Sequence, residues 1–297
     1  MALFSKKTTL VHNITYMAIM TAINLVFIVL DTFVPFMMLL LILLLPFVSA
    51  VVSYFCQKRY YIIYAVASVG LCLIFSISST IFYIVPALCS GFVIGVLLDK
   101  KVNPFWMILS STLIEVALTY AFIPLIKLMT GADMVETFLT IFHLNEFAYK
   151  EELMHLFILF IALTQCSISH FVLLNEIKKI GVETDTRITS FIPYIIGLFA
   201  CLAIGTIFAF TYKPLSLAFV ALSFYFAIFL LVNIVMAKRI SGYVVLGVSM
   251  LVAFVFFIIF FTKIEKPMGF MLFGLFSLTI GLTSFFQNVL LNRGNNN

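Results

Sequence analysis

Long apolar stretches follow one another along this chain, separated by short polar segments. The first covers residues 13–30, NITYMAIMTAINLVFIVL, and contains no charged residue. At about 1.5 Å rise per residue, a helix of about 20 such residues crosses the hydrocarbon core of a bilayer. Because a backbone in lipid must satisfy its own hydrogen bonds, a series of such stretches folds as helices. The pattern therefore predicts an all-α, polytopic transmembrane bundle.

About ten stretches qualify as spans. They cover residues 13–30, 36–56, 61–78, 80–98, 104–128, 153–175, 190–212, 215–237, 243–262 and 269–291. The chain is 64% hydrophobic and 10% charged, whereas a soluble domain is about half apolar and a quarter charged. This composition leaves little room for a soluble domain. The net charge of +5 does not predict a nucleic-acid partner, because the basic residues lie in short loops between spans.

The distribution of lysine and arginine predicts the orientation, since cytoplasmic loops carry an excess of both. With the N-terminus inside, the inner side holds Lys6, Lys7, Lys58, Arg59, Lys100, Lys101, Lys178, Lys179, Arg187, Lys238, Arg239 and Arg293. The outer side holds Lys127, Lys150, Lys213, Lys263 and Lys266. We therefore expect a multi-pass protein of the cell membrane with both termini in the cytoplasm. No cleavage site ends a short apolar region, so a cleavable signal peptide is not expected.

Two connections are longer and more polar than the rest. Residues 131–152, between the fifth and sixth spans, place Met134, Phe138, Ile141 and Phe142 at helical spacing. They predict an interfacial helix at the outer surface, either a lipid-seated connector or a lid over an outward-facing site. The linker 175–189, NEIKKIGVETDTRIT, is the strongest candidate for a domain boundary. We expect a membrane core at residues 1–178 and an additional four-helix region at 179–297.

Small residues on the first span carry a family resemblance. Ala18 and Ala22 lie four residues apart and share one helix face. Such pairs let another helix approach closely, and internal packing is their commonest use. Their position near the inner end of the first helix resembles the substrate-binding S components of energy-coupling factor (ECF) transporters. The stretch Phe82–Lys101, FYIVPALCSGFVIGVLLDKK, is similar to that family's fourth helix, with Gly91 and Gly95 before a basic exit.

The resemblance covers residues 8–178 and implies a function. An S component binds a small vitamin-like molecule from outside and delivers it inward with a transmembrane coupling protein and ATPases. It would place Ala18 and Ala22 at the coupling-protein interface. The arrangement of an S-component-like six-helix core followed by more helices resembles the larger YybS-like membrane proteins. Six-helix members end where this chain continues for over a hundred residues, so the additional helices depart from the six-helix pattern.

Glu115 is the main candidate binding residue, because it lies near the middle of the fifth span. A charged group there costs about 2.5–3.5 kcal/mol on insertion scales, so such residues concentrate at functional sites. It either fixes helix packing or binds a cationic or donor-rich ligand. Thr119 and Phe122 share its helix face, whereas Tyr120 points elsewhere. Gln165 in the antiparallel sixth span is expected opposite Glu115, and Asn24 and Tyr83 complete the predicted substrate site.

Several classes of function are not expected. The chain lacks GxGxxG, Walker, HExxH and GxSxG motifs, so we predict no enzyme, no catalytic residue, no metal site and no cofactor. Its five cysteines are odd in number and form no CxxC pair, so they are interpreted as apolar core residues. Two alternatives stay open beside the S component. One is a non-transporting envelope scaffold related to MreD-like proteins, and the other is a proton-coupled secondary carrier using Glu115.

Overall fold

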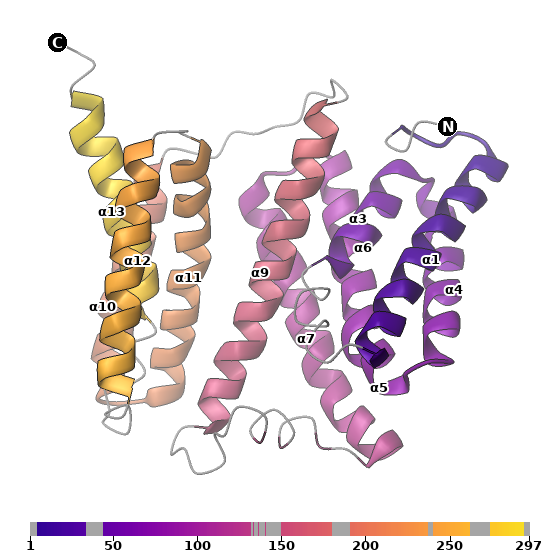
Figure 1. Ribbon diagram of the computed structural model, residues 1–297, viewed down its shortest axis with the longest axis horizontal. Helices are drawn as coiled ribbons and strands as arrows, with labels where there is room; N and C mark the ends of the chain where they lie inside the picture. Colours follow the sequence, from indigo (N-terminus) through magenta and orange to yellow (C-terminus); the bar gives the residue numbers. More distant parts are fainter. Residues whose placement is uncertain are drawn as a thin grey trace. The chain divides into compact units, whose positions relative to one another are not determined.

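The computed structural model describes residues 5–33, 44–131, 133, 136, 140, 150–179, 191–236, 240–261 and 274–293 (Figure 1). Nearly all of these residues are helical and none of them forms a strand, which confirms the all-α prediction. The chain divides into two compact units. Unit 1 comprises Met1–His143 and Ile161–Arg187, and unit 2 comprises Leu144–Phe160 and Ile188–Asn297. The division predicted from sequence, at residue 178, stays a prediction.

Most helices belong to one unit, and one long helix is shared by the two units. Unit 1 contains α1 (Leu10–Phe33), α3 (Leu45–Phe55), η1 (Lys58–Tyr60), α4 (Tyr61–Leu73), α5 (Ile77–Ser79), the π-helix η2 (Thr80–Ile84), α6 (Val85–Asp99) and α7 (Pro104–Thr130). The shared helix is α9 (Lys150–Lys179), whose second half belongs to unit 1. Unit 2 adds α10 (Phe191–Ala209), α11 (Lys213–Met236), α12 (Ile240–Phe261) and α13 (Gly274–Arg293).

Six helices of the described chain are long and apolar enough to cross a membrane. They cover Leu10–Asp31, Ile77–Asp99, Pro104–Thr130, Met154–Lys179, Ile192–Ala209 and Lys213–Val232. They make this a multi-pass helical membrane protein. The count of about ten spans is not confirmed: within the described residues the remaining apolar stretches are shorter, among them Leu45–Phe55, Tyr243–Phe256 and Gly274–Gln287. For example, α3 and α4 have 11 and 13 residues, which at 1.5 Å per residue reach roughly 16–20 Å of a core about 30 Å thick.

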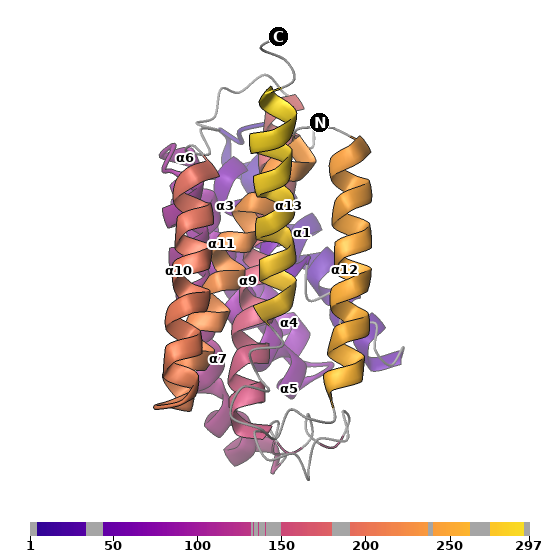
Figure 2. The same ribbon diagram turned by 90° about the vertical axis from the view of Figure 1, so that its left-hand side faces the viewer.

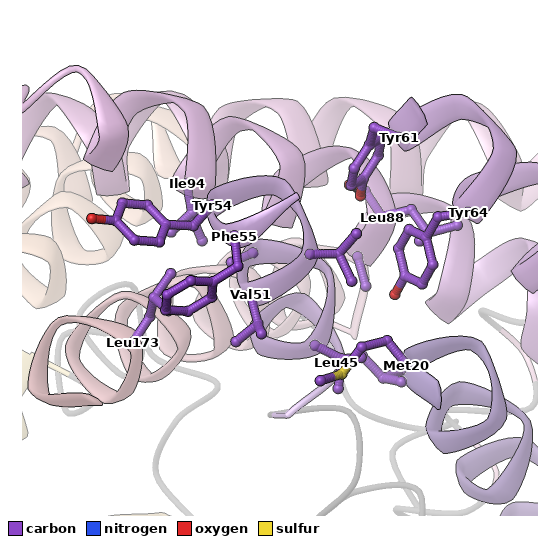
Figure 3. Close-up of a cluster of buried hydrophobic side chains, with 14 of the residues drawn as sticks. Met20, Leu45, Val51, Tyr54, Phe55, Tyr61, Tyr64, Leu88, Ile94 and Leu173 are labelled. Carbon is purple, nitrogen blue, oxygen red and sulfur yellow. Dashed lines mark hydrogen bonds between the residues drawn. The ribbon is translucent and has the colours of Figure 1, made fainter. Parts of the chain in front are cut away.

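The core of unit 1 is built around the short helix α3. Ten of its eleven residues are buried, so it is enclosed on all sides and needs no polar face. Its side chains join those of α1, α4, α6 and α9 in one hydrophobic cluster, which includes Phe55 of α3 and Leu173 of α9 (Figure 3). Tyr61 and Tyr64 enter the same cluster from α4. Because lipid tails are as apolar as these side chains, close van der Waals packing within the cluster, and not removal from water, stabilises the unit.

The contact between α3 and α6 depends on two glycines. A Cβ atom at Gly95 would lie 2.6 Å from the Ala50 carbonyl oxygen and 2.6 Å from the Ser53 Cβ, both on α3. One turn earlier, a Cβ at Gly91 would lie 2.5 Å from the Ser49 Cβ. Because atoms cannot approach so closely, only glycine permits this separation of the two backbones. The predicted small-residue face of residues 82–101 is therefore used inside unit 1.

Two serines of α3 form hydrogen bonds across the same contact. Ser49 donates to the Leu88 carbonyl at 3.0 Å, and Ser53 donates to the Phe92 carbonyl at 2.9 Å. Tyr61 of α4 donates to the Leu88 carbonyl as well, at 2.7 Å. A serine in a lipid-buried helix needs a partner within the protein. The spacing of four residues on both helices lets each serine find one on the neighbouring backbone.

Ion pairs connect the N-terminal segment to one end of unit 1. Asp99, at the last turn of α6, pairs with Lys6 at 2.8 Å and with Lys58 at 2.8 Å. The backbone N–H of Lys7 donates to the Phe55 carbonyl at 2.8 Å, and burial lowers the pKa of the Lys7 ammonium group. These contacts bring the N-terminal segment, the α3–α4 connection and the end of α6 to the same end of the unit. The lysine and arginine pattern had predicted that all three share one side.

Replacing Asp99 by asparagine should loosen this N-terminal segment without unfolding the unit. Both ion pairs are partly exposed, and pairs of this kind contribute up to about 1 kcal/mol each. We expect faster tryptic cleavage after Lys6 and Lys7 and a loss of about 1 kcal/mol in the free energy of unfolding. Glu176→Gln, which removes the exposed pair with Lys179, is the control and should leave cleavage at the N-terminus unchanged. Unchanged cleavage in Asp99→Asn would show that the pairs do not hold the segment.

Unit 2 is an apolar helical bundle with hydroxyl contacts between helices. α13 lies between α10 and α12 and packs on α11 (Figure 2). Ser223 of α11 and Ser277 of α13 share a hydrogen bond of 2.8 Å, and Ser249 of α12 and Thr283 of α13 share one of 3.3 Å. The first half of α9 adds Leu156, which packs with residues of α10 and α11. Short hydroxyl side chains therefore connect these helices in the same way as in unit 1.

Candidate functional site

Glu115 lies in the interior of unit 1, on the middle of α7. The helix begins at Pro104, where the Asn103 side chain accepts a hydrogen bond from the Phe105 N–H at 2.9 Å. It ends at Gly131, whose φ of 71° is the left-handed conformation that glycine adopts readily. Between these caps, Glu115 is the eleventh residue after Pro104 and the fifteenth before Thr130. The side chain is 2% exposed, so its carboxyl group is withdrawn from both solvent and lipid.

The protein surrounds this carboxyl group with weak hydrogen-bond donors. The Cys166 thiol of α9 donates to the Glu115 Oε2 at 3.1 Å. The Ser90 hydroxyl of α6 is a second hydrogen-bond neighbour of the carboxyl group. Ser111 and Thr112, one turn earlier on α7, lie beside the same thiol. No lysine or arginine in the described part of the chain forms an ion pair with Glu115.

His170 lies one helical turn beyond Cys166 on α9. Residues four apart share a helix face, and Leu173 and Ile177 continue this face into the hydrophobic cluster of unit 1. The imidazole is fully buried, and neither of its ring nitrogens has a hydrogen-bond partner among the described residues. A buried imidazole normally satisfies both nitrogens. This face of α9 therefore has unused donor and acceptor capacity one helical turn from the residue that contacts the carboxyl group.

The structure places the other predicted residues of α7 as their spacing indicates. Thr119 is buried, as is Glu115, and Phe122 is half-buried. Tyr120 is 37% exposed, so it lies away from the face that Glu115 occupies. Gln165 is buried on α9, and its Oε1 has no partner among the described residues. Cys166, and not Gln165, meets the carboxyl group, because adjacent helical residues differ by about 100° in direction.

Asn24 belongs to a separate polar network between α1 and α4. Its Nδ2 donates to the Tyr64 hydroxyl at 2.8 Å and to the Ser68 hydroxyl at 3.4 Å, and Thr21 bonds Ser68 at 3.2 Å. No hydrogen bond in the described part of the chain joins this network to Glu115. Asn24 thus connects α1 to α4 through hydrogen bonds of its Nδ2, whereas its Oδ1 has no partner in the described residues.

Tyr83 and the alanine pair lie at other positions of unit 1. Tyr83 is half-buried on η2 and packs against the hydrophobic cluster. Nearby in sequence, the Ser79 hydroxyl donates to Asp31 at the end of α1, at 2.8 Å. Ala18 and Ala22 are both exposed on α1, so they do not pack inside unit 1. The predicted outer segment 131–152 lies mostly outside the described residues, as does most of the linker 175–189.

Sequence reasoning missed the partners of Glu115. All five cysteines are free thiols, and Cys166 makes a polar contact where an apolar core residue was expected. Its position beside Gln165, at the depth of Glu115 in an antiparallel helix, was the available signal. In the described residues no group of three or more His, Cys, Asp or Glu side chains is placed to hold a metal ion. The site instead offers a ligand the Glu115 carboxyl group and neighbouring hydrogen-bonding side chains.

Comparison with family models, with curated proteins and with solved structures finds no match to this chain.

Proposed function

We propose that this protein is an S-component-like membrane protein that binds a small vitamin-like molecule at Glu115 for ECF-type uptake. The observation that carries the proposal is a fully buried carboxyl group in the middle of a membrane helix, surrounded by a thiol and hydroxyls and lacking an ion-pair partner in the described residues. A glutamate at such depth in the membrane is costly, so such residues concentrate at functional sites. A bound ligand that completes the hydrogen bonds of Glu115 accounts for its position. Thr119 and Phe122, with Gln165, Asn24 and Tyr83, are the further candidates for contact with the molecule.

The partners of this function are a transmembrane coupling protein and ATPases. The exposure of Ala18 and Ala22 supports this part of the proposal, because a small-residue face that is unused internally remains free for a partner helix. The direct test is co-expression of the chain with an ECF-type coupling protein and its ATPases, followed by purification through a tag on this chain. Co-purification in stoichiometric amounts supports the proposal. A chain that purifies alone under every lipid condition contradicts it.

The proposed topology has about ten spans in the cell membrane and both termini in the cytoplasm. Single cysteines introduced near Lys178, at the end of α9, and near Lys127, at the end of α7, test it. The five native cysteines are first replaced. A membrane-impermeant maleimide added to intact cells should label the site near Lys127 and leave the site near Lys178 unlabelled. Labelling near Lys178 from outside would reverse the topology.

A non-transporting scaffold is the second candidate, and one observation favours it. The α3–α6 contact and the Asn24–Tyr64 hydrogen bond pack unit 1 tightly around α3, as a structural core requires. A scaffold needs no ligand, so its stability in the membrane should not respond to any small molecule. Thermal stabilisation by a vitamin-like compound separates the two functions.

A further inference from the structure

We propose that the Glu115 site takes a small organic cation, whose positive group binds the carboxylate while its polar remainder bonds His170. The proposal rests on the proposed function and specifies the chemical class of its ligand. A buried carboxylate loses its hydration, and an opposite charge or a set of strong donors must replace that hydration. The described protein supplies neither at this position.

The hydrogen bonds at Glu115 are too few and too weak to hold a negative charge. A carboxylate has about four acceptor positions. Cys166 fills one with a thiol, which is a weak donor, at 3.1 Å. Ser90 contributes a hydroxyl that also lies 3.4 Å from the Ala87 carbonyl oxygen. The remaining positions suit the N–H groups of an ammonium, amidinium or ring cation, or the field of a quaternary one.

The described residues of the helices around Glu115 provide no positive charge that pairs with its carboxylate. In the unit 1 parts of α6, α7 and α9, the other charged residues all lie in terminal turns; they are Asp99, Lys127, Glu176, Lys178 and Lys179. Among these, Asp99, Lys127 and Lys179 already form ion pairs. With a neutral or anionic ligand the buried carboxyl group would have no opposite charge beside it and would be protonated, whereas a cation pairs with its ionised form. A cation is therefore the class of ligand that this charge distribution selects.

His170 sets the size and the second polar feature of the ligand. Four residues along α9 correspond to about 6 Å of rise along the helix axis, so His170 lies one helical turn from the residue that contacts Glu115. Its two nitrogens offer one donor and one acceptor in the neutral form, and neither is used within the described residues. A single heterocycle that bears a positive group at one end and an amide, amine or ring nitrogen at the other fits this spacing.

A set of probes with the same ring and different charges tests the inference on the full-length protein in nanodiscs. Nicotinate, nicotinamide and 1-methylnicotinamide share one ring and differ in charge, and thiamine, choline and spermidine extend the cationic set. Melting temperature and calorimetric Kd are measured for each. We expect at least one cationic probe to bind and stabilise the protein, with nicotinate inactive. Glu115→Gln should weaken binding of that cation at least tenfold, which corresponds to about 1.4 kcal/mol. His170→Phe, which keeps a ring but removes both nitrogens, should weaken it as well.

Two further variants control for folding. Glu176→Gln removes a carboxylate from the exposed end of α9 and should leave the affinity unchanged. Glu115→Leu should melt no lower than wild type while binding no cation, since an apolar side chain is tolerated well at a buried site. Equal binding of nicotinate, unchanged affinity in Glu115→Gln, or the absence of binding by every cationic probe would each overturn the inference. Co-purification of the coupling protein would still stand in those cases, so failure of the ligand class and failure of the proposed function are distinguishable.

Discussion

Gly91→Ala and Gly95→Ala should each destabilise unit 1 by up to about 2 kcal/mol, and the double variant should fail to fold. Overpacking a tight contact costs about 1–3 kcal/mol, occasionally more, while replacing glycine by alanine within a helix gains about 1 kcal/mol. The steric cost exceeds the gain here, because the new Cβ atoms would meet rigid groups. At Gly95 these are the Ala50 carbonyl and the Ser53 Cβ, both at 2.6 Å, and at Gly91 they include the Pro46 carbonyl. Forcing α3 from α6 would also stretch the serine hydrogen bonds.

Thermal unfolding in detergent measures the effect, and Gly70→Ala is the matched control. Gly70 lies on the exposed face of α4, where an added Cβ meets nothing within 4 Å. That variant should be as stable as wild type or more stable by up to about 1 kcal/mol. If alanine at Gly91 and at Gly70 had the same effect, the α3–α6 contact would not be close in solution.

Changing Ala18 and Ala22 together to leucine should abolish binding of the coupling protein while leaving the chain folded. Both alanines are exposed on α1, so the leucines meet lipid and not the core of unit 1. A partner helix that packs against small side chains would be displaced by several ångströms, and its van der Waals contacts would be lost. We expect co-purification to fall to background and the melting temperature to stay within about 2 °C of wild type, in keeping with a surface change under 0.5 kcal/mol.

A second exposed pair separates loss of the partner from a general effect of added bulk. Ala67 and Gly70 are small and exposed on α4 of the same unit. Leucines at these positions should leave co-purification intact. Retention of the coupling protein by the Ala18, Ala22 double variant would remove these residues from the proposed interface. A large drop in its melting temperature would instead indicate that the pair packs within the folded protein.

The helices were predictable because their cause is local. Apolar stretches in lipid must be helical, so each predicted span has a helix at its position wherever the chain is described. Which of them cross the membrane was not predictable, because hydropathy does not reveal that α3 is enclosed by its neighbours and has only 11 residues. The face of Glu115 and Thr119 followed from the helical period, as did the different direction of Tyr120.

The contacts of Glu115 depend on the rotation of α9 about its own axis. The positions of the two residues in antiparallel spans predict that Gln165 lies at the membrane depth of Glu115. A rotation of α9 about its axis by one residue, about 100°, decides whether Gln165 or Cys166 faces the carboxyl group. Tertiary packing sets that rotation, and no local pattern records it. The same limit applies to Asn24, whose partners Tyr64 and Ser68 lie 40 and 44 residues away. The weak polarity of a thiol also concealed Cys166 among residues interpreted as apolar.

The ion pairs of Asp99 have a consequence for the order of events at the ribosome. Lys6 and Asp99 are 93 residues apart, so at 5–20 residues per second the acid is made about 5–20 s after the lysine. Until then, Lys6 and Lys58 lack this carboxylate partner. The N-terminal segment can therefore form these ion pairs only after α6 has been synthesised. Closure of this end of unit 1 is thus coupled to the synthesis of α6.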